Sequence, residues 1–371
     1  MMNISTMRQI NGKTYRYGFT TGSCAAAASK AAVTMLLNGK VIDKIQLLTP
    51  AGIELNIVIH DVIIENECVS CSVIKDSGDD PDITNGIKVF SKVMLNNLNK
   101  IIINAGIGIG RVTKKGLPVE VGKPAINPVP MQMIMSEVSQ LMHNNQGITI
   151  EVSIPEGESI SSKTFNKRLG IEGGISILGT SGIVVPMSDE AFKESLSLEI
   201  SMLKEQGYRE ILMTPGNYGE AFISEHIQNA KNRTVTTSNF IGFMLHEAIR
   251  YDMQKILLVG HIGKLIKVAG GIFHTHSNIA DCRNEIMASH YMKFSGDVEG
   301  FTNIMKSNTT EEAIDYVKDE SFFDYLCETI QIRCNQHIRN NISVEVMVFS
   351  QVKGLLGKTS QVNNWIQTYF S

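Results

Sequence analysis

The sequence predicts two domains: a mixed α+β domain over residues 1–155, then a doubly wound, Rossmann-like α/β domain over residues 156–371. The chain is long enough to build two hydrophobic cores. Strand-like and helix-like segments have no regular order in the first part. After residue 174 they alternate, which is typical of a parallel sheet with crossover helices. The polar, glycine-bearing stretch 156–174 between the two parts is interpreted as the crossing between domains.

Composition places the chain among ordinary proteins of the cytoplasm. Hydrophobic residues make up 43% and charged residues 19%, and the net charge is −3, so a basic nucleic-acid-binding domain is not expected. The longest uncharged run, residues 173–188, is too short and too broken for a membrane span. Arg8, Lys13 and Arg16 interrupt the N-terminus, which therefore does not resemble a signal peptide. The six cysteines lack the spacing of a disulfide framework and are expected to be reduced.

The first expected helix runs from about Thr20 to Asn38, in the stretch "TTGSCAAAASKAAVTMLLN". Thr20, Thr21 or Ser23 can accept a hydrogen bond from a free N–H of the first turn, and Asn38-Gly39 ends the helix. Its alanines favour helix formation and suit a tightly packed internal helix. The hydroxyls and free N–H groups of the first turn suit an anion or a ligand instead. The local pattern leaves both interpretations open.

Runs rich in Ile and Val predict strands in the rest of the first domain, and helical spacing of apolar residues predicts two more helices. The expected strands are residues 43–50, 53–64, 68–76, 100–106 and 148–155, and the expected helices are 82–99 and 125–147. Asn127 is the expected cap of the second of these helices, Pro128 lies in its first turn, and residues 144–147 end it.

The second domain is expected to alternate strands and helices. The expected strands are residues 174–179, 210–216, 233–238 and 255–260, and the helices are 188–206, the residues after 217, 239–253 and 261–271. A helical tail follows from Thr310, with a last strand at 343–350 and a helix around Trp365.

Parallel sheets of this kind bind ligands at the carboxyl ends of their strands. The four strand ends carry glycine, hydroxyl and amide side chains, in the stretches GTSG (179–182), TPGNYGE (214–220), TSN (237–239) and GHIGK (260–264). These residue types predict a shelf for a polar ligand at this edge.

Gly106, Gly108 and Gly110 follow an expected strand with the spacing GxGxG. Many nucleotide and S-adenosylmethionine sites have such a loop after their first strand, because glycine lets the backbone approach a ligand closely. The residues after this loop do not begin a helix, since Val112 is β-branched and Pro118 breaks the stretch. A simple turn without a ligand explains the glycines equally well.

A basic cluster lies beside this loop. The chain as a whole is slightly acidic, so a local excess of positive charge indicates a polyanionic substrate. The cluster comprises Arg111, Lys114, Lys115 and Lys123.

Four aspartates, Asp76, Asp79, Asp80 and Asp82, lie within "KDSGDDPDITNG". The stretch fails as a calcium loop, because it lacks the glycine and the glutamate that such a loop needs. A solvated turn that caps the following helix explains most of the four. Carboxylates this close repel one another, however, so one of them is a candidate general base with a raised pKa.

The stretch "GHIGKLIKVAGGIFHTHSNIAD" concentrates His261, Lys264, Lys267, His274 and His276. In an extended segment, His274 and His276 point to the same side. Such a pair can ligate zinc or iron, but the candidate further ligands nearby lack diagnostic spacing. We favour histidines that bind or deprotonate a substrate.

Together, these stretches resemble the CbiD family, the cobalt-precorrin-5B C(1)-methyltransferases of oxygen-independent cobalamin synthesis. The resemblance runs from about Tyr15 to Ala280, and Ser23 stands where the family commonly has threonine. The stretches that carry it are "YGFTTGSCAAAASKAA", "KDSGDDPDITNG", "GIGIGRVTKKGLPVEVGKPAINPVP", "TFNKRLGIEGGISILGTSGIVVPMS", "PGNYGE", "SNFIGFMLHEA" and "ILLVGHIGKLIKVAGGIFHTHS".

The resemblance implies methyl transfer from S-adenosylmethionine to ring carbon 1 of cobalt-precorrin-5B, which gives cobalt-precorrin-6A. The expected partner is therefore a small-molecule corrin precursor fringed with carboxylates. It carries its own cobalt, so no protein-bound metal is expected. Nucleic acid and membrane are not expected as partners. A homo-oligomer and transient contact with neighbouring pathway enzymes stay open.

Site roles follow from the resemblance together with the residue types. The candidates for proton transfer are Asp76, Asp79, His261 and His274. The candidates for S-adenosylmethionine are Gly106, Gly108, Gly110, Gly216 and Asn217. The candidates for the substrate are Thr20, Thr21, Ser23, Arg111, Lys114, Lys264 and His276.

Two other classes of function stay open. A metal-dependent hydrolase would use His274 and His276 as ligands. A non-catalytic tetrapyrrole carrier would bind the macrocycle without S-adenosylmethionine. A dehydrogenase that uses NAD is disfavoured, because no GxGxxG motif opens a helix in either half.

Overall fold

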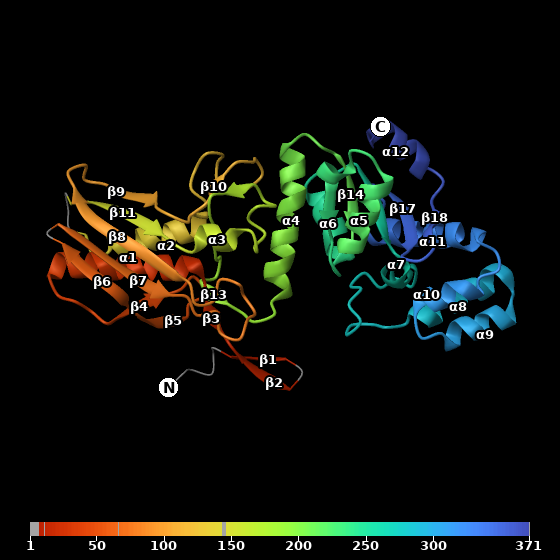
Figure 1. The fold of residues 1–371 in the computed structure, drawn as a ribbon, viewed down its shortest axis with the longest axis horizontal. Coiled ribbons are helices and arrows are strands. Elements are labelled where there is room, and N and C mark those ends of the chain that lie inside the picture. The colour runs from red at the N-terminus through yellow and green to blue at the C-terminus, as the bar shows by residue number, and fades with distance from the viewer. Residues whose placement is uncertain (1–6, 11, 66, 143–145, 371) are drawn as a thin grey trace. The chain divides into compact units, whose positions relative to one another are not determined.

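The computed structural model describes residues 7–10, 12–65, 67–142 and 146–370, and it has a mixed α and β architecture (Figure 1). The chain forms two compact units, Met1–Asp189 and Glu190–Ser371. The division lies beyond the boundary expected at residue 155.

Residues 156–189 belong to the first unit because two short strands in this stretch pair with earlier strands. β12 (Ile171–Glu172) pairs with β10 (Arg111–Val112), and β13 (Ile183–Val184) pairs with β3 (Gly18–Phe19). These contacts join segments far apart in sequence, so local composition could not reveal them.

The alanine-rich helix α1 (Thr21–Asn38) lies at the centre of the first unit. Thr20 caps it by accepting a hydrogen bond from the Ser23 N–H, and Gly39 ends it in the left-handed conformation. All six of its alanines are fully buried, since the helix packs on strands β7 and β8 and on helix α2 (Pro128–Ser139) (Figure 1). The prediction of a tightly packed internal helix is therefore confirmed, and small side chains allow these close contacts.

Helix α1 lies on a five-stranded sheet with the strand order β6-β7-β8-β11-β9. The pairs are antiparallel except for β11 and β9, which are parallel. The strands are β6 (His60–Glu65), β7 (Cys68–Ile74), β8 (Lys88–Asn96), β9 (Ile101–Ala105) and β11 (Gly147–Ser153).

One element of this sheet was predicted wrongly. Residues 82–99 were expected to form a helix, but they contain strand β8. Val89, Ser91 and Val93 are buried and alternate with more exposed residues, which is the period of a strand. Pairing with both β7 and β11 fixes this conformation.

Helix α2 begins at Pro128 as predicted, with Asn127 in the cap position. It ends at Ser139, earlier than expected, and the predicted end signal at Asn144 lies outside the described residues. The remaining elements of this unit are the hairpins β1 (Met7–Ile10) with β2 (Lys13–Arg16) and β4 (Lys44–Leu48) with β5 (Glu54–Val58), and the short helix α3 (Gly157–Ser161).

The second unit is built on a five-stranded sheet with the order β15-β14-β16-β17-β18. The first four strands are parallel, and β18 pairs antiparallel with β17. The strands are β14 (Glu210–Thr214), β15 (Thr234–Thr236), β16 (Lys255–His261), β17 (Ser343–Ser350) and β18 (Gly354–Lys358). The predicted strands 210–216, 233–238, 255–260 and 343–350 are thus confirmed. The expected strand at 174–179 is not part of this sheet, because Ile175 and Ile177 bridge to the first unit's own loops.

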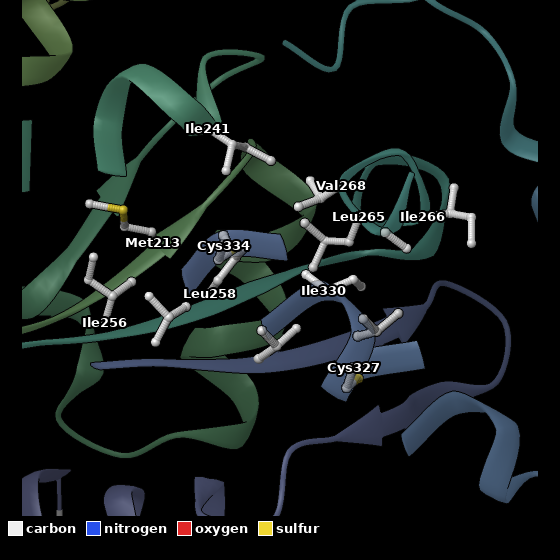
Figure 2. Close-up of a cluster of buried hydrophobic side chains, with 14 of the residues drawn as sticks. Met213, Ile241, Ile256, Leu258, Leu265, Ile266, Val268, Cys327, Ile330 and Cys334 are labelled. Carbon is white, nitrogen blue, oxygen red and sulfur yellow. The ribbon is translucent and has the colours of Figure 1, made fainter. Parts of the chain in front are cut away.

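Hydrophobic side chains cover both faces of this sheet. On one face Ile211, Met213, Ile256 and Leu258 join a cluster with the helices α6, α7 and α11, part of which Figure 2 shows. On the other face, intervening strand residues such as Leu257 pack with α5 and α12. Burial on both faces is typical of strands in parallel sheets.

The helices of this unit are α4 (Asp189–Glu205), α5 (Asn217–His226), α6 (Ile241–Arg250), α7 (Ile262–Ala269), α8 (Arg283–Ser295), α9 (Val298–Lys306), α10 (Thr310–Ala313), α11 (Ser321–His337) and α12 (Val362–Phe370), with 3-10 turns at Ala230–Arg233 and Ile314–Tyr316. Helices α8 and α9 had not been predicted. Among the described residues, no helix has the length and apolar character that a membrane span requires.

Candidate functional site

Three of the four predicted polar loops lie at the carboxyl edge of the second unit's sheet. They follow β14, β15 and β16 and comprise residues 214–217, 237–239 and 261–264. The fourth, residues 179–182, belongs to the first unit: a Cβ on Gly179 would lie 2.4 Å from Thr20 Oγ1, and one on Gly182 would lie 2.9 Å from Thr49 Cβ. The prediction that this loop contributes to the shelf was wrong.

The strand order reverses between β14 and β16. From β14 the chain passes through α5 to β15 on one side, and from β15 through α6 to β16 on the other side. Open α/β sheets bind ligands at the carboxyl ends of their strands, at such a reversal. Lys264 spans this position, because its Nζ donates a 2.7 Å hydrogen bond to the carbonyl oxygen of Pro215. Burial, followed by the charge of Lys267, lowers the pKa of Lys264.

Helix α5 begins at this strand reversal without a side-chain cap. Its cap residue, Gly216, has φ 143° and ψ −174°, a conformation that is essentially restricted to glycine. A Cβ on Gly216 would have a single neighbour within 4 Å, the Nζ of Lys264 at 4.0 Å. The turn is therefore open on its outer side, and the N–H groups of Asn217 and Tyr218 have no acceptor within the part of the chain that the structure describes.

Thr214 lies beneath this turn and is fully buried. Its hydroxyl has no hydrogen-bond partner among the described residues. A Cβ on Gly219, in the first turn of α5, would lie only 1.6 Å from that hydroxyl oxygen. Glycine at position 219 thus lets the Thr214 hydroxyl reach the start of the helix.

His261 ends strand β16 and caps α7. Its Nδ1 accepts a hydrogen bond from the Gly263 N–H at 3.1 Å, and its Nε2 lies 2.5 Å from Glu311 Oε1. An accepting Nδ1 places the ring proton on Nε2, which donates to Glu311. Glu311 also accepts from Ser350 Oγ and from the Gln351 N–H. Burial raises the pKa of Glu311, but these hydrogen bonds outweigh it and the net shift is downward.

His274 and His276 lie in a segment that crosses the start of α6. The ring of His274 packs edge-on to Phe240, with 4.9 Å between ring centroids. Lys267 holds the segment, since its buried Nζ donates to the carbonyl oxygens of Thr275 and Ala280. His276 is exposed, and its Nδ1 accepts from the Asn278 N–H. No group of three or more histidine, cysteine, aspartate or glutamate side chains within the described residues could hold a metal ion.

The Gly106–Gly110 loop of the first unit is closed by the chain itself. A Cβ on Gly108 would lie 1.7 Å from the carbonyl oxygen of Ile154, and one on Gly110 would lie 2.4 Å from Ile171 Cγ2. The Gly106 and Gly110 N–H groups donate to the carbonyl oxygens of Val152 and Ile175. Close packing of backbone on backbone explains these glycines without a ligand.

The N-terminus of α1 is closed in the same way. The Gly22 N–H donates to the Leu178 carbonyl oxygen, and the Thr21 hydroxyl both donates to that oxygen and accepts from the Leu178 N–H. Ser23 Oγ donates to the Gly182 carbonyl oxygen at 2.7 Å. The three hydroxyls are buried. They cap the helix and fasten it to residues 178–182, so the hypothesis of an open anion site at this end was wrong.

The four aspartates of the acidic loop have partners from the same unit. Asp76 forms a two-pronged pair with the guanidinium of Arg16, which lowers the pKa of Asp76. Asp79 accepts from the Arg16 N–H. Asp80 accepts from the N–H of Met187.

Asp82 pairs with Lys75, whose side chain is almost fully buried. Burial works to raise the pKa of Asp82, but the charge and hydrogen bond of Lys75 prevail and lower it. The hypothesis of a raised carboxylate pKa in this loop was therefore wrong for Asp76 and Asp82. Through these partners, the carboxylates connect the acidic loop to Arg16 of strand β2 and to Met187, near the end of the first unit.

The predicted basic cluster is exposed. Arg111, Lys114, Lys115 and Lys123 all reach solvent. Arg111 donates to the Gly122 carbonyl oxygen, and the stem of Lys114 covers Gly170. Both retain charged ends that a ligand could contact.

Sequence reasoning missed Thr214 and Glu311. Thr214 ends the strand whose following glycine was selected, so the strand-end rule could have included it. Glu311 lies 50 residues from His261, and no local signal links the two.

Two family models match this chain: CbiD over residues 8–186, and the C-terminal domain of CbiD over residues 274–360. A protein of Thermoanaerobacter sp. (strain X514) named cobalt-precorrin-5B C(1)-methyltransferase is 45% identical, over 98% of this chain and 100% of its own length. One of the same name from Alkaliphilus metalliredigens (strain QYMF) is 44% identical, over 96% of each.

A solved structure of the cobalamin biosynthesis protein (cbiD) from Archaeoglobus fulgidus is 27% identical and covers 71% of this chain and 83% of its own, with a TM-score of 0.39. The matches in sequence extend over both units and include every stretch that carried the resemblance. The chain belongs to the CbiD family.

Proposed function

We propose that this chain methylates ring carbon 1 of cobalt-precorrin-5B with S-adenosylmethionine as the donor, and that its second unit is a Rossmann-like donor domain. Relatives with the name of that methyltransferase match the chain over nearly its whole length. The observation that carries the location is the open glycine turn at the strand reversal, where Gly216 faces Lys264.

The residues at this turn fit the donor. The space outside Gly216 lets a ligand approach the backbone, and Asn217 offers an N–H without an acceptor among the described residues. The buried Thr214 hydroxyl supplies an unused polar group. We assign Gly216 and Asn217 to the donor and give Gly106, Gly108 and Gly110 a packing role. Bound S-adenosylmethionine supplies an electrophilic methyl group.

The protein's contribution is to hold donor and acceptor in line and to exclude water from them. The hydrogen bonds at both ring nitrogens of His261 suit a positioning role, in which the pair with Glu311 fixes the start of helix α7, which carries Lys264. His274 is the proposed proton acceptor, because Lys267 holds its segment at this edge. The paired states of Asp76 and Asp79 suit a structural role.

Contacts with the acceptor are assigned to exposed cationic or polar side chains. His276 of the second unit is exposed and is proposed to bind a carboxylate at the corrin periphery. Arg111 and Lys114 of the first unit are also exposed, and each is proposed independently as a carboxylate-binding side chain. Replacing each by Gln should raise the KM for the corrin and leave the melting temperature unchanged.

The test is an anaerobic incubation of the full chain with cobalt-precorrin-5B and S-adenosylmethionine labelled in its methyl group. Mass spectrometry of the macrocycle should show one labelled methyl, and fragmentation should place it on ring carbon 1. An unlabelled ring from a chain that binds both ligands would contradict the reaction. Tight corrin binding without any binding of S-adenosylmethionine would indicate a carrier instead.

Within this reaction, His274→Asn should lower kcat by about a hundredfold, which is the lower range for removal of an acid–base group. His276→Asn is the matched variant two residues away, and we expect it to change the KM for the corrin without lowering kcat. A wild-type kcat in His274→Asn would remove His274 from this role.

A further inference from the structure

A cation lies at the positive end of helix α5. The helix has 10 residues and its first turn carries the partial positive charge of the macrodipole. Lys264 Nζ lies 4.0 Å from the position of a Cβ on Gly216, the cap residue of that helix. Within the part of the chain that the structure describes, Lys264 has no carboxylate partner, and its single hydrogen bond is to a neutral carbonyl. The acidic residue in the first turn of α5, Glu220, accepts a hydrogen bond from the Thr236 hydroxyl, whereas Lys264 has no carboxylate among the described residues to neutralise its charge at the turn.

The second, independent observation is the hydroxyl of Thr214. Its residue is 0% exposed, its oxygen is unpartnered among the described residues, and it is directed at the first turn of α5 through the gap that Gly219 leaves. Proteins rarely keep a buried hydroxyl without a partner, because its lost hydration is not compensated. A ligand at the turn would supply the hydrogen-bond partner that the Thr214 hydroxyl lacks.

We propose that Lys264, the Thr214 hydroxyl and the N-terminal turn of α5 together form a carboxylate-binding subsite. The N–H groups of Asn217 and Tyr218 and the ammonium of Lys264 are donors for the two oxygens of a carboxylate. This inference rests on the proposed function, whose two ligands both bear carboxylates. The carboxylate is either that of the methionine end of the donor or one at the periphery of the corrin.

The experiment uses the full chain and four variants. Lys264→Met removes the cation and keeps the stem, and Thr214→Val removes the hydroxyl and keeps the shape. Lys255→Met is the matched lysine control, because Lys255 begins β16, the strand that leads into α7 and Lys264, and also donates to a neutral partner, Tyr369. Thr214→Ser is the control that retains a hydroxyl.

The first measurement is calorimetric binding of S-adenosylmethionine and of its decarboxylated analogue. If the subsite holds the donor, the wild type prefers the intact donor, and Lys264→Met and Thr214→Val weaken that donor about tenfold, the loss of one charge-assisted hydrogen bond. The affinity of these two variants for the decarboxylated analogue stays unchanged, so their preference for the intact donor disappears. The controls Lys255→Met and Thr214→Ser keep the wild-type preference for the intact donor.

The second measurement is the KM for each substrate. If the carboxylate belongs to the acceptor, Lys264→Met and Thr214→Val raise the KM for cobalt-precorrin-5B about tenfold and leave donor binding unchanged. Both results support the subsite and differ only in the source of the carboxylate.

Thermal denaturation provides a readout that does not depend on activity. Because the Thr214 hydroxyl is unpartnered in the free protein, Thr214→Val should leave the melting temperature unchanged or raise it while ligand binding weakens. A lowered melting temperature with unchanged binding would give the hydroxyl a structural role and overturn the subsite. Lys264→Met with wild-type affinity for both ligands would overturn it too. A wild-type chain that binds neither ligand would overturn the proposed function and the subsite together.

Discussion

Helices α1 and α5 both begin at a turn that the sequence marked for ligands, but the structure gives the two turns opposite states. At α1 the hydroxyls of Thr21 and Ser23 and the Gly22 N–H bind carbonyl groups of residues 178–182. At α5 no side chain caps the turn, and its nearest cation is Lys264.

The two glycine loops differ in the same way. Gly108 is enclosed by the backbone of residues 154–157, whereas a Cβ on Gly216 would meet a single flexible side chain at 4.0 Å. Hydrogen-bond donors that already have an acceptor within the chain stabilise the fold. Donors without such an acceptor are available to bind a ligand. Glycine and hydroxyl motifs alone therefore do not locate a binding site.

The largest expected effect is at the closed glycine loop. Gly108→Ala puts a Cβ 1.7 Å from the Ile154 carbonyl oxygen, at a residue with φ 75°. We expect a loss of about 3 kcal/mol or more in the free energy of unfolding, from backbone strain and overpacking. Gly122→Ala is the control, since Gly122 has φ 84° but open space around it, and it should lose about 1–2 kcal/mol. Urea denaturation measures both, and equal losses would contradict the close packing.

The next effect tests the closed helix start. Thr20→Val removes the cap of α1 and should lower the free energy of unfolding by about 1–2 kcal/mol. The KM values for both substrates should stay unchanged, because the hydroxyls of Thr21 and Ser23 and the N–H groups of Gly22 and Ser23 already have partners within the first unit. Thr302→Val, at a half-buried position of α9 where the hydroxyl donates to the Val298 carbonyl oxygen of its own helix, should change neither quantity. A raised KM in Thr20→Val would restore α1 as a ligand site.

A smaller effect is expected at the acidic loop. Asp76→Asn weakens the exposed pair with Arg16 and should cost about 1 kcal/mol of stability. Arg16 lowers the pKa of Asp76 in the folded state, so the stabilisation is present above its ordinary pKa of 3.8 and is lost as the pH falls through the lowered value. The difference between wild type and variant should therefore shrink in acid, which denaturation at several pH values measures.

The exposed residue Asp43 serves as the control for Asp76, and Asp43→Asn should leave the free energy of unfolding at the wild-type value. A hundredfold or larger loss of kcat in Asp76→Asn with unchanged stability would contradict the structural role. That size of loss, about a hundredfold, is typical of a general base.

The smallest effect is expected at Glu311, whose pair with His261 is proposed to fix the start of helix α7 beside the Gly216 turn. Glu311→Gln loses the charge toward His261 and one of the two carboxylate oxygens, since Ser350 donates to Oε2 whereas His261 and Gln351 meet Oε1. The free energy of unfolding should therefore fall by about 0.5–1 kcal/mol. The pKa of Glu311 is lowered in the folded state. Its contribution is therefore present above the ordinary value and lost as the pH falls through the lowered one.

Glu328→Gln, on an exposed position of α11, is the control for Glu311→Gln. The KM for the donor should rise slightly in Glu311→Gln and stay at the wild-type value in the control. A lower KM in Glu311→Gln would show that the pair with His261 does not support the loop.

The local sequence pattern was sufficient to predict many of the helices and strands. Capping signals located α1 and α2, and alternation of strands and helices located the parallel sheet of the second unit. It failed at residues 88–96, whose strand conformation depends on pairing with β7 and β11. It also failed at residues 174–179, where contacts with distant loops prevail over a strand-like composition.

The site was predictable where chemistry follows directly from topology. Gly216 and Lys264 were selected because they follow neighbouring parallel strands, and the structure brings them together. Thr21 and Gly108 were selected on equally good local grounds, but residues about Leu178 and Ile154, distant in sequence, close them. Which of two similar motifs stays open is decided by tertiary packing.

The most direct test of this difference is hydrogen exchange of the full chain, followed by mass spectrometry, with and without S-adenosylmethionine. We predict that the donor slows exchange in peptides covering residues 214–220 and 261–266, because the Asn217 and Tyr218 N–H groups gain acceptors. Peptides covering residues 20–24 and 106–110 should exchange at the same slow rate in both states. Slowing confined to residues 20–24 or 106–110 would contradict the account and place the donor in the first unit.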